Sequence, residues 1–377
     1  MALKGGIWLG GKEFLVNPAM STLMNRVDSF CARFGLKRPI LLAPMAGVPA
    51  PELSIAVINE GGLGACGVLM LQPKQIIDWA DQVRSQSNGP FQLNTWIPDP
   101  PPKRDLEHEA QVRDFLGEWG PPVDPDAGDA TPPDFTAQCE AMLGVGPAAI
   151  SSIMGLYPAE FVARLKQKGI PWFATISTVK EARAAAAAGA DVIVAQGSEA
   201  GGHRGSFEAA EAERKQVGLF SLLPAVVDAV DLPVVATGGI ADPRGVAAAL
   251  ILGASAVQIG TAFLPCPEAG IHPIWSSSLA QTAPEDTVVS RVFSGRAGRS
   301  IETDYVRAAT AEAAPAPAPY PVQRGLTGAM RAAAAKEADI HRMQAWAGQS
   351  AALARAEPAG QVVRGLWEKA QGILAGR

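Results

Sequence analysis

The chain has 377 residues, of which 48% are hydrophobic and 18% charged, so it can bury a large core and general disorder is excluded. With 32 basic against 37 acidic residues, the formal net charge is −5, and no basic run offers a binding surface for nucleic acid. The four widely spaced cysteines favour neither a disulfide framework nor a zinc cluster, and the N-terminus lacks a secretory signal. We therefore expect a cytoplasmic protein that does not interact with membranes.

Eight short apolar runs alternate with helix-like segments along most of the chain. Each run is almost continuously apolar, as strands of a parallel sheet are when helices cover both faces. The runs are residues 40–43, 63–65, 91–94, 149–154, 172–175, 192–195, 234–236 and 256–259. Eight strands with helical crossovers predict an α/β fold of the (β/α)₈ TIM-barrel type, and a doubly wound open sheet is the alternative.

The intervening segments carry helix start and stop signals. Pro51 and Pro158 each begin a helix, Thr178 can cap one, and Asp242 precedes another. Glycines follow as stop signals at 61, 169, 189 and 253. The uncharged stretch at residues 245–264 therefore predicts a helix, a glycine stop and a buried strand rather than a membrane span.

Two regions interrupt the alternation. Residues 98–133 contain several proline pairs around a helix-like stretch, too long for a simple barrel loop and typical of a lid or excursion. Residues 314–320 predict a stiff connector, and residues 326–374 are Ala-rich and helical in pattern. The expected organisation is a barrel at 26–96 and 141–264, an insertion and mainly helical cap at 97–140 and 265–377, and an N-terminal extension at 1–25.

Gly62, Gly64 and Gly67 match the spacing GxGxxG of dinucleotide-binding loops. That motif must follow a strand and begin a helix, so that a pyrophosphate meets the helix N-terminus. Here the glycines follow a helix-like segment. They predict a helix C-terminus that runs into the second strand.

Glycines also follow the last two predicted strands. Gly238 and Gly239 end one strand just before the helix start at Asp242, and Gly260 and Thr261 end the next. Backbone amides in such loops, with the positive end of a helix dipole, can bind an anion. The loops after strands seven and eight of a TIM barrel frequently form a phosphate site.

The loop at residues 195–205 packs four glycines around His203, at the end of the predicted sixth strand. A bulky planar ligand close to the backbone would explain so many small residues. The histidine can act as a general base or, protonated, stabilise negative charge. The other histidines, His108, His272 and His341, have no metal-ligand spacing with it or with one another, so no metal site is expected.

Two further strand ends carry candidate ligand contacts. Ala43, Pro44 and Met45 follow the first strand, and a methionine there can lie under an aromatic ring system. Asn94 ends the third strand, where its carboxamide can donate to and accept from a heterocycle.

Together these pieces resemble the nitronate monooxygenase family, formerly called 2-nitropropane dioxygenases, whose members are FMN enzymes on a TIM barrel. The resemblance covers roughly residues 30–300. The matching segments are PILLAPMAG (39–47), EGGLGACG (60–67), QLN (92–94), AQGSEAGGHRG (195–205), VVATGGIAD (234–242), VQIGTAFL (257–264) and FSGR (293–296).

The resemblance implies roles for individual residues. The flavin ring would lie near Ala43, Pro44 and Met45, and Asn94 and Gln196 would contact its polar edge. The ribityl phosphate would be held by Gly201, Gly202, Gly238, Gly239, Gln258, Gly260 and Thr261. His203 falls on the active-site histidine of the family. Several relatives have a lysine where this chain has Thr175, which puts the rate and the substrate preference in question.

The expected activity is oxidation of alkyl nitronates, and of nitroalkanes, by O₂ to a carbonyl compound and nitrite. The alternative is an FMN-dependent reductase that uses NAD(P)H to reduce quinones or enoyl thioesters on the same barrel. A flavin- or phosphate-binding module without turnover, such as a carrier or assembly subunit, is a third alternative and belongs to a different class of protein. The expected partners are a small nitronate or nitroalkane and O₂, and a homodimer is a candidate assembly.

Overall fold

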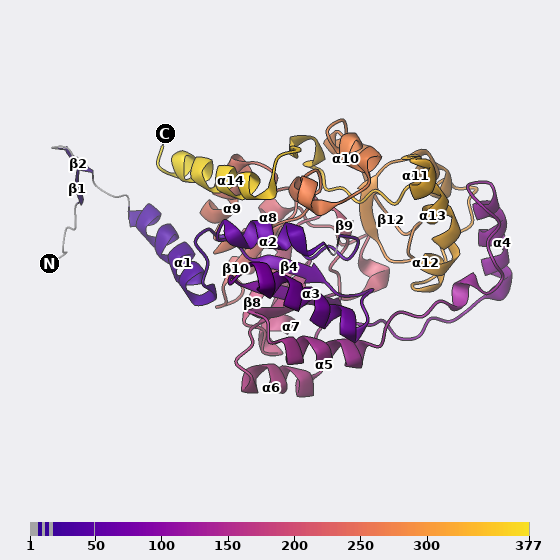
Figure 1. Cartoon of the computed structure of the whole chain (residues 1–377), viewed down its shortest axis with the longest axis horizontal. Helices are drawn as coiled ribbons and strands as arrows, with labels where there is room; N and C mark the ends of the chain where they lie inside the picture. Colours follow the sequence, from indigo (N-terminus) through magenta and orange to yellow (C-terminus); the bar gives the residue numbers. More distant parts are fainter. Residues whose placement is uncertain (1–6, 10–11, 15–17, 49, 377) are drawn as a thin grey trace.

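Eight parallel strands form one sheet in the computed structural model, which describes residues 7–9, 12–14, 18–48 and 50–376 and whose elements are labelled in Figure 1. The strands are β3 (Ile40–Leu42), β4 (Gly64–Gly67), β5 (Phe91–Trp96), β6 (Ala149–Ile153), β7 (Trp172–Ile176), β8 (Val192–Gln196), β10 (Val234–Thr237) and β11 (Ala256–Ile259). They pair in chain order, and a bridge between Leu41 and Leu63 joins the two edges into a nearly closed barrel. The predicted TIM-barrel type is confirmed, and the alternative of an open sheet is wrong.

The register of the late strands aligns their polar last residues. Thr237 of β10 pairs with Gln196 of β8 on one side and with Gln258 of β11 on the other. Because the strands are parallel, their carboxyl ends open onto the same face of the barrel. The loops that carry the candidate site residues therefore emerge together.

Seven helices in the described residues surround the barrel. The helices are α2 (Pro51–Asn59), α3 (Pro73–Gln86), α5 (Phe135–Val145), α6 (Ala159–Gln167), α7 (Val179–Ala187), α8 (Leu219–Val227) and α9 (Pro243–Ile251). Four of them, α2, α6, α7 and α9, begin and end beside the predicted signals. Thr178 forms a capping box with Glu181 at α7, and Asp242 caps α9. The glycine motif at 62–67 leads from α2 into β4, as predicted. No helix in the described ranges is long and apolar enough to cross a membrane.

Helix α1 (Pro18–Phe34) covers the amino-terminal end of the barrel. Its Phe34 ring packs edge-on against Phe173 of β7, with ring centroids 5.0 Å apart, and Phe30 completes this cluster. Strands β1 (Ile7–Leu9) and β2 (Lys12–Phe14) form an antiparallel hairpin before α1. Of the N-terminal extension expected at residues 1–25, residues 1–6, 10–11 and 15–17 lie outside the described part.

The segments added to the barrel contain strands as well as helices. The strands are β9 (Gly202–His203), β12 (Thr287–Ser290) and β13 (Gly298–Ile301), and the helices are α4 (Leu106–Gly117), α10 (Pro273–Leu279), α11 (Asp304–Ala309), α12 (Val322–Leu326), α13 (Gly328–Glu337) and α14 (Ala359–Leu374). Short 3₁₀ turns are η1 (Ala127–Asp129), η2 (Ala209–Glu211), η3 (Thr261–Phe263), η4 (Pro267–Ala269), η5 (Pro284–Asp286) and η6 (Ala351–Leu353). Strands β12, β13 and β9 form one antiparallel sheet, so the addition is not a purely helical body.

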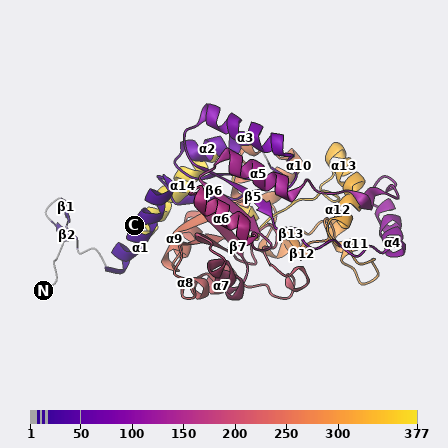
Figure 2. The same ribbon diagram turned by 90° about the horizontal axis from the view of Figure 1, so that it is seen from below.

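Helix α4 of the proline-rich insertion packs beside α11, α12 and α13, at the end of the molecule away from α1 (Figures 1 and 2). Val112 and Leu116 of α4 join Tyr305, Leu326 and Met330 in a hydrophobic cluster that is separate from the barrel core. The insertion is thus docked on the C-terminal segment. Helix α14, by contrast, returns to the barrel and packs against α2 and α9.

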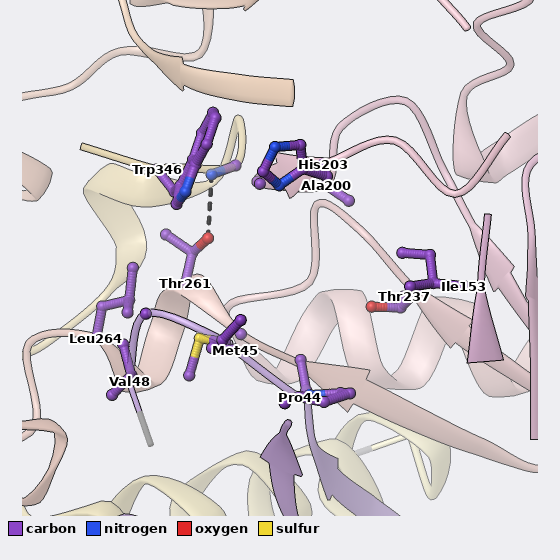
Figure 3. A pocket seen from close by; sticks show the side chains of 18 of the residues that line it. Pro44, Met45, Val48, Ile153, Ala200, His203, Thr237, Thr261, Leu264 and Trp346 are labelled. Atoms are coloured by element: carbon purple, nitrogen blue, oxygen red, sulfur yellow. Dashed lines mark hydrogen bonds between the residues drawn. The ribbon is translucent and has the colours of Figure 1, made fainter. Parts of the chain in front are cut away.

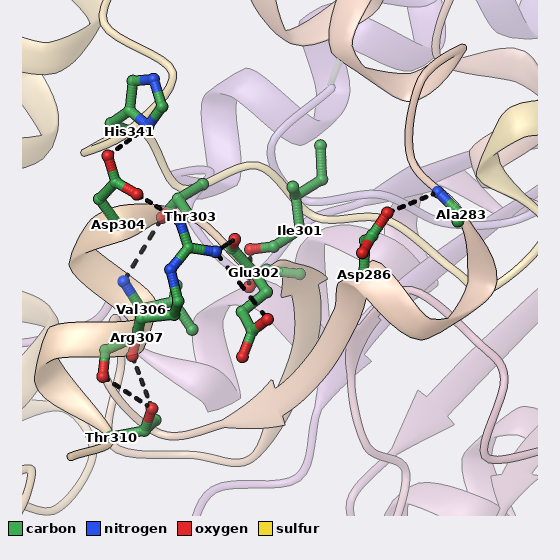
Figure 4. Close-up of polar contacts among 11 residues, drawn as sticks. Ala283, Asp286, Ile301, Glu302, Thr303, Asp304, Val306, Arg307, Thr310 and His341 are labelled. Carbon is green, nitrogen blue, oxygen red and sulfur yellow. Dashed lines mark hydrogen bonds and ion pairs between the residues drawn. The ribbon is translucent and has the colours of Figure 1, made fainter.

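Polar contacts tie the start of α11 to its neighbours (Figure 4). Thr303 caps α11 by accepting a hydrogen bond from the amide of Val306, and Asp304 lies 2.7 Å from His341. The amide of Tyr305 also donates to the carbonyl of His341. These contacts fix the segment after α13, which then runs toward the barrel mouth.

Candidate active site

A cavity of about 340 Å³ lies at the carboxyl ends of the strands, and each of them contributes to its wall except β3, from which the following residues contribute. The thirteen site residues predicted from the sequence all line it. They are Ala43, Pro44, Met45, Asn94, Gln196, Gly201, Gly202, His203, Gly238, Gly239, Gln258, Gly260 and Thr261. The barrel therefore brings together loops that are far apart in the sequence.

Pro44 and Met45 lie on one side of this cavity, and His203 and Trp346 lie on the other (Figure 3). A Cβ atom on Gly260 would lie 3.3 Å from the Cβ of Ala43 and 3.5 Å from the sulfur of Met45. The glycine thus keeps the wall beside Met45 flat. A planar ring system fits between these two sides.

Backbone amides form a cradle after β10. Gly238 and Gly239 have φ of +109° and +67°, which L side chains rarely adopt. Their amides donate to no acceptor in the described part of the chain. Asp242 already occupies the N-terminus of α9, because its carboxylate accepts from the amide of Gly245. The free amides, rather than the dipole of α9, are what this loop offers to an anion.

The segment from Trp346 to Ser350 covers this cradle, which the sequence did not reveal. The amide of Gly348 donates to the hydroxyl of Thr261 over 3.0 Å (Figure 3), and Ser350 donates to the carbonyl of Gly239. A Cβ on Gly201 would lie 2.5 Å from the nitrogen of Gly348. Two glycines therefore allow the two backbones to meet.

The two carboxamides expected at the polar edge of the flavin are partly engaged by the protein. Asn94 lines the cavity and donates through Nδ2 to the hydroxyl of Ser151. Gln196 accepts from the amide of Gly205 and donates to the carbonyl of His203. Gln196 thereby braces the loop that carries the histidine.

His203 is positioned by residues outside the barrel. It lies in β9, opposite Gly298 of β13, and its ring lies between Trp96 and Trp346, with centroid distances of 4.5 and 4.7 Å. Its Nε2 is 2.7 Å from the hydroxyl of Ser294. When that hydroxyl donates its single proton to the carbonyl of Arg296, Nε2 carries the imidazole proton and Nδ1 is the basic nitrogen.

The surroundings of His203 disfavour its charged form. Removal from bulk water, and after it the positive charges of Arg324 and Arg296 in that order, lower the pKa of His203 to about 3. The imidazole is therefore neutral at physiological pH. Of the two roles expected from the sequence, a protonated histidine that stabilises a nitronate conflicts with this environment.

Two arginines from the segment added after the barrel place positive charge at the cavity. Arg324 of α12 and Arg331 of α13 line it together with Tyr320, whose ring packs on Trp96. Sequence reasoning assigned no role to either arginine. They lie on two successive helices, so the periodicity of a single helix could not have placed them together.

The other histidines noted in the sequence make contacts within the fold and do not line the cavity. His108 lies 2.7 Å from the carbonyl of Ala316, and His272 caps α10. Within the described ranges, no group of three or more His, Cys, Asp or Glu side chains could hold a metal ion. Thr175 lies on the cavity wall and adds no charge there.

The chain is similar to known proteins over most of its length. The nitronate monooxygenase family model matches residues 29–369. A nitronate monooxygenase of Paraburkholderia phytofirmans is 38% identical over 341 residues, covering 87% of this chain and 91% of the relative. A probable nitronate monooxygenase of Bacillus subtilis is 36% identical over 337 residues, covering 86% and 93%.

Solved structures show the same relationship. A nitroalkane oxidase from Streptomyces ansochromogenes has a TM-score of 0.82 at 34% identity, covering 91% of this chain and 98% of that one. FabK from Thermotoga maritima has a TM-score of 0.71 at 25% identity, covering 92% and 97%. The match of the family model over most of the chain, with these relatives, shows that the chain belongs to the nitronate monooxygenase family of flavin-dependent oxidoreductases.

Proposed function

We propose that this chain uses FMN to oxidise alkyl nitronates with O₂, giving a carbonyl compound and nitrite. The observation that carries the proposal is the meeting of a free-amide cradle, a flat apolar wall and a neutral histidine in one cavity. The family membership supports the same reaction.

The residues of the cavity fit the parts of FMN. Ala43, Pro44 and Met45 would lie along the isoalloxazine ring, and Asn94, which lines the same cavity, would contact its polar edge. The cradle at Gly238 and Gly239 would hold the phosphate, and Gly201, Gly202, Gln258, Gly260 and Thr261 would complete this end. When bound, the flavin would supply the electron transfer between nitronate and O₂.

The side chains opposite Met45 would act on the substrate. His203, neutral, can accept a proton from the carbon beside a nitro group. The negative charge of a nitronate would be met by Arg324 and Arg331 rather than by the imidazole. We further propose that residues 97–140 and 265–377 serve as the cap of this site, because Trp346, Tyr320 and both arginines come from them.

The test is the visible spectrum of the purified protein, followed by anaerobic titration with an alkyl nitronate and, separately, with NADH. The proposal expects a flavin spectrum that the nitronate bleaches and NADH does not. Bleaching by NADH alone would instead establish the NAD(P)H-using reductase. A colourless protein that takes up no FMN would overturn both.

A further inference from the structure

Gln92 of β5 is a fully buried polar side chain that does not line the cavity. Its Nε2 donates to the carbonyl of Leu42 over 3.3 Å and to Oε1 of Gln258 over 3.0 Å. The side-chain oxygen of Gln92 has no hydrogen-bond partner among the described residues. A buried acceptor without a partner costs stability, so the gain that offsets this cost has to be found elsewhere.

The two glutamines form a polar layer between an apolar cluster and the cavity. Side chains at alternate positions of a strand point to the same side of the sheet. Ala256, two residues before Gln258, belongs to the apolar cluster that includes Leu41 and Val194. Gln258 itself lines the cavity. The contact between Gln92 and Gln258 therefore joins a residue buried beneath the site to one that faces its ligand.

This contact fixes the orientation of the Gln258 carboxamide. A carboxamide has an accepting oxygen and a donating nitrogen, and a half-turn about its last bond exchanges the two. The carbonyl of Leu42 can only accept, so the atom of Gln92 beside it is the nitrogen. That nitrogen also donates to Gln258, so the Gln258 atom turned toward Gln92 is the oxygen. The Gln258 nitrogen donates to no described residue, and its two N–H groups remain for a ligand of the cavity.

We propose that Gln92 is a positioning residue that holds Gln258 with its carboxamide nitrogen available to the cofactor. The inference rests on the proposed function, because FMN is the ligand, and it deepens the cofactor site. Gln258 then donates to an acceptor atom of FMN, whereas the opposite orientation would bring two acceptors together. The barrel thus keeps an unpartnered oxygen on Gln92 in exchange for a fixed donor on Gln258.

A double-mutant cycle on FMN binding tests the proposal. Gln92→Met and Gln258→Met each keep the approximate size of the side chain and remove its hydrogen bonds. In the full-length protein each should weaken FMN binding about three- to tenfold, measured by titration of flavin fluorescence. Because Gln92 acts through Gln258, the double variant should bind FMN within about twofold of Gln258→Met alone.

A purely structural role gives a different pattern. If Gln92 served only to satisfy the carbonyl of Leu42, its loss would weaken FMN binding equally with and without Gln258. Gln138→Met is the matched control, because Gln138 is also buried and donates to three backbone carbonyls at residues 68–71. Its effect on FMN binding should multiply with that of Gln258→Met. The same multiplication for Gln92→Met would overturn the inference.

A spectroscopic measurement reports on the donor itself. In protein labelled with ¹⁵N in its glutamines, the carboxamide signal of Gln258 is assigned by its loss in Gln258→Met. We expect FMN to slow the exchange of these N–H protons with solvent about tenfold, and Gln92→Met to remove most of this protection. Protons that exchange equally fast with and without FMN, or that stay equally protected in Gln92→Met, would contradict a donor held by Gln92.

Binding and activity separate this inference from the proposed function. If an alkyl nitronate bleaches the flavin while the effects of Gln92→Met and Gln258→Met multiply, only the inference fails. If the two substitutions are coupled but no nitronate bleaches the flavin, the positioning role stands and the proposed reaction fails. A protein that takes up no FMN overturns both.

Discussion

The two sides of the cavity differ in the kinds of residue that line them. The barrel side consists of strand ends whose lining is glycine, small apolar residues and uncharged amides, and it offers mostly backbone. The opposite side, from residues 275–350, offers Trp346, Tyr320, Arg324 and Arg331. The comparison indicates that the barrel holds the cofactor through its main chain, whereas the added segments select the substrate through side chains.

The two sides also have separate cores. The cluster around Tyr305 and Leu326 is distinct from the barrel core, and it is held by α4 from one part of the chain and by α11 to α13 from another. Local stability can therefore differ between them. Variants on each side should then give different functional outcomes.

The largest expected effect is at His203, which lies on a loop of the barrel and contacts Trp346 of the opposite side. His203→Asn should reduce oxidation of neutral nitroalkanes by about 10²–10⁴-fold, because a general base is lost, and should affect preformed nitronates far less. The measurement is kcat/KM for the two forms of one nitro compound. Equal losses on both forms would show that His203 is not the base.

A matched pair of core variants compares the two sides directly. Leu326→Ala in the added segments and Leu165→Ala in α6 of the barrel each empty a fully buried position. Each should lower the free energy of unfolding by about 2–5 kcal/mol, measured with urea.

Only Leu326→Ala should also raise KM, because α12 carries Arg324. A rise in KM of the same size in Leu165→Ala would contradict the division of labour between the two sides.

A substitution at Gly201 tests the backbone contact between the barrel side and the opposite side of the cavity. Gly201→Ala places a Cβ 2.5 Å from the nitrogen of Gly348, so the backbones must separate. We expect a cost of about 1–3 kcal/mol, seen as roughly ten- to hundredfold weaker FMN retention in a dialysis or fluorescence titration.

Gly144→Ala is the control, because nothing lies within 4 Å of its added Cβ. If both variants retain FMN alike, the covering segment does not contribute to the cofactor site.

The smallest expected effect concerns pH. With a pKa of about 3, His203 loses its proton well below neutrality and stays neutral as pH rises. The kcat/KM for a preformed nitronate, which reports the free enzyme, should therefore show no limb from His203 between about pH 5 and pH 8. A limb near pH 6.5 that disappears in His203→Asn would contradict the neutral imidazole.

Much of the barrel side could be predicted from local sequence. Apolar runs, the caps at Thr178 and Asp242, and the glycines after β10 depend on neighbours only a few positions away. Even the assignment of Gly62–Gly67 to a helix end and a strand followed from order along the chain. Asp242 caps α9, as its place before Pro243 predicted, and the anion site beside it stays a prediction.

The sequence by itself determined the strands, their order and the loops that carry Met45, His203 and Gly238, because these follow from short-range periodicity and turn chemistry. Only the tertiary structure decided what faces those loops. Ser294 is 91 positions from His203, and Gly348 is 87 from Thr261. Such contacts arise from the pairing of β13 with β9 and from burial in the second core, and no local pattern encodes that pairing. The charge of the cavity, and with it the neutrality of His203, is therefore a property of the fold.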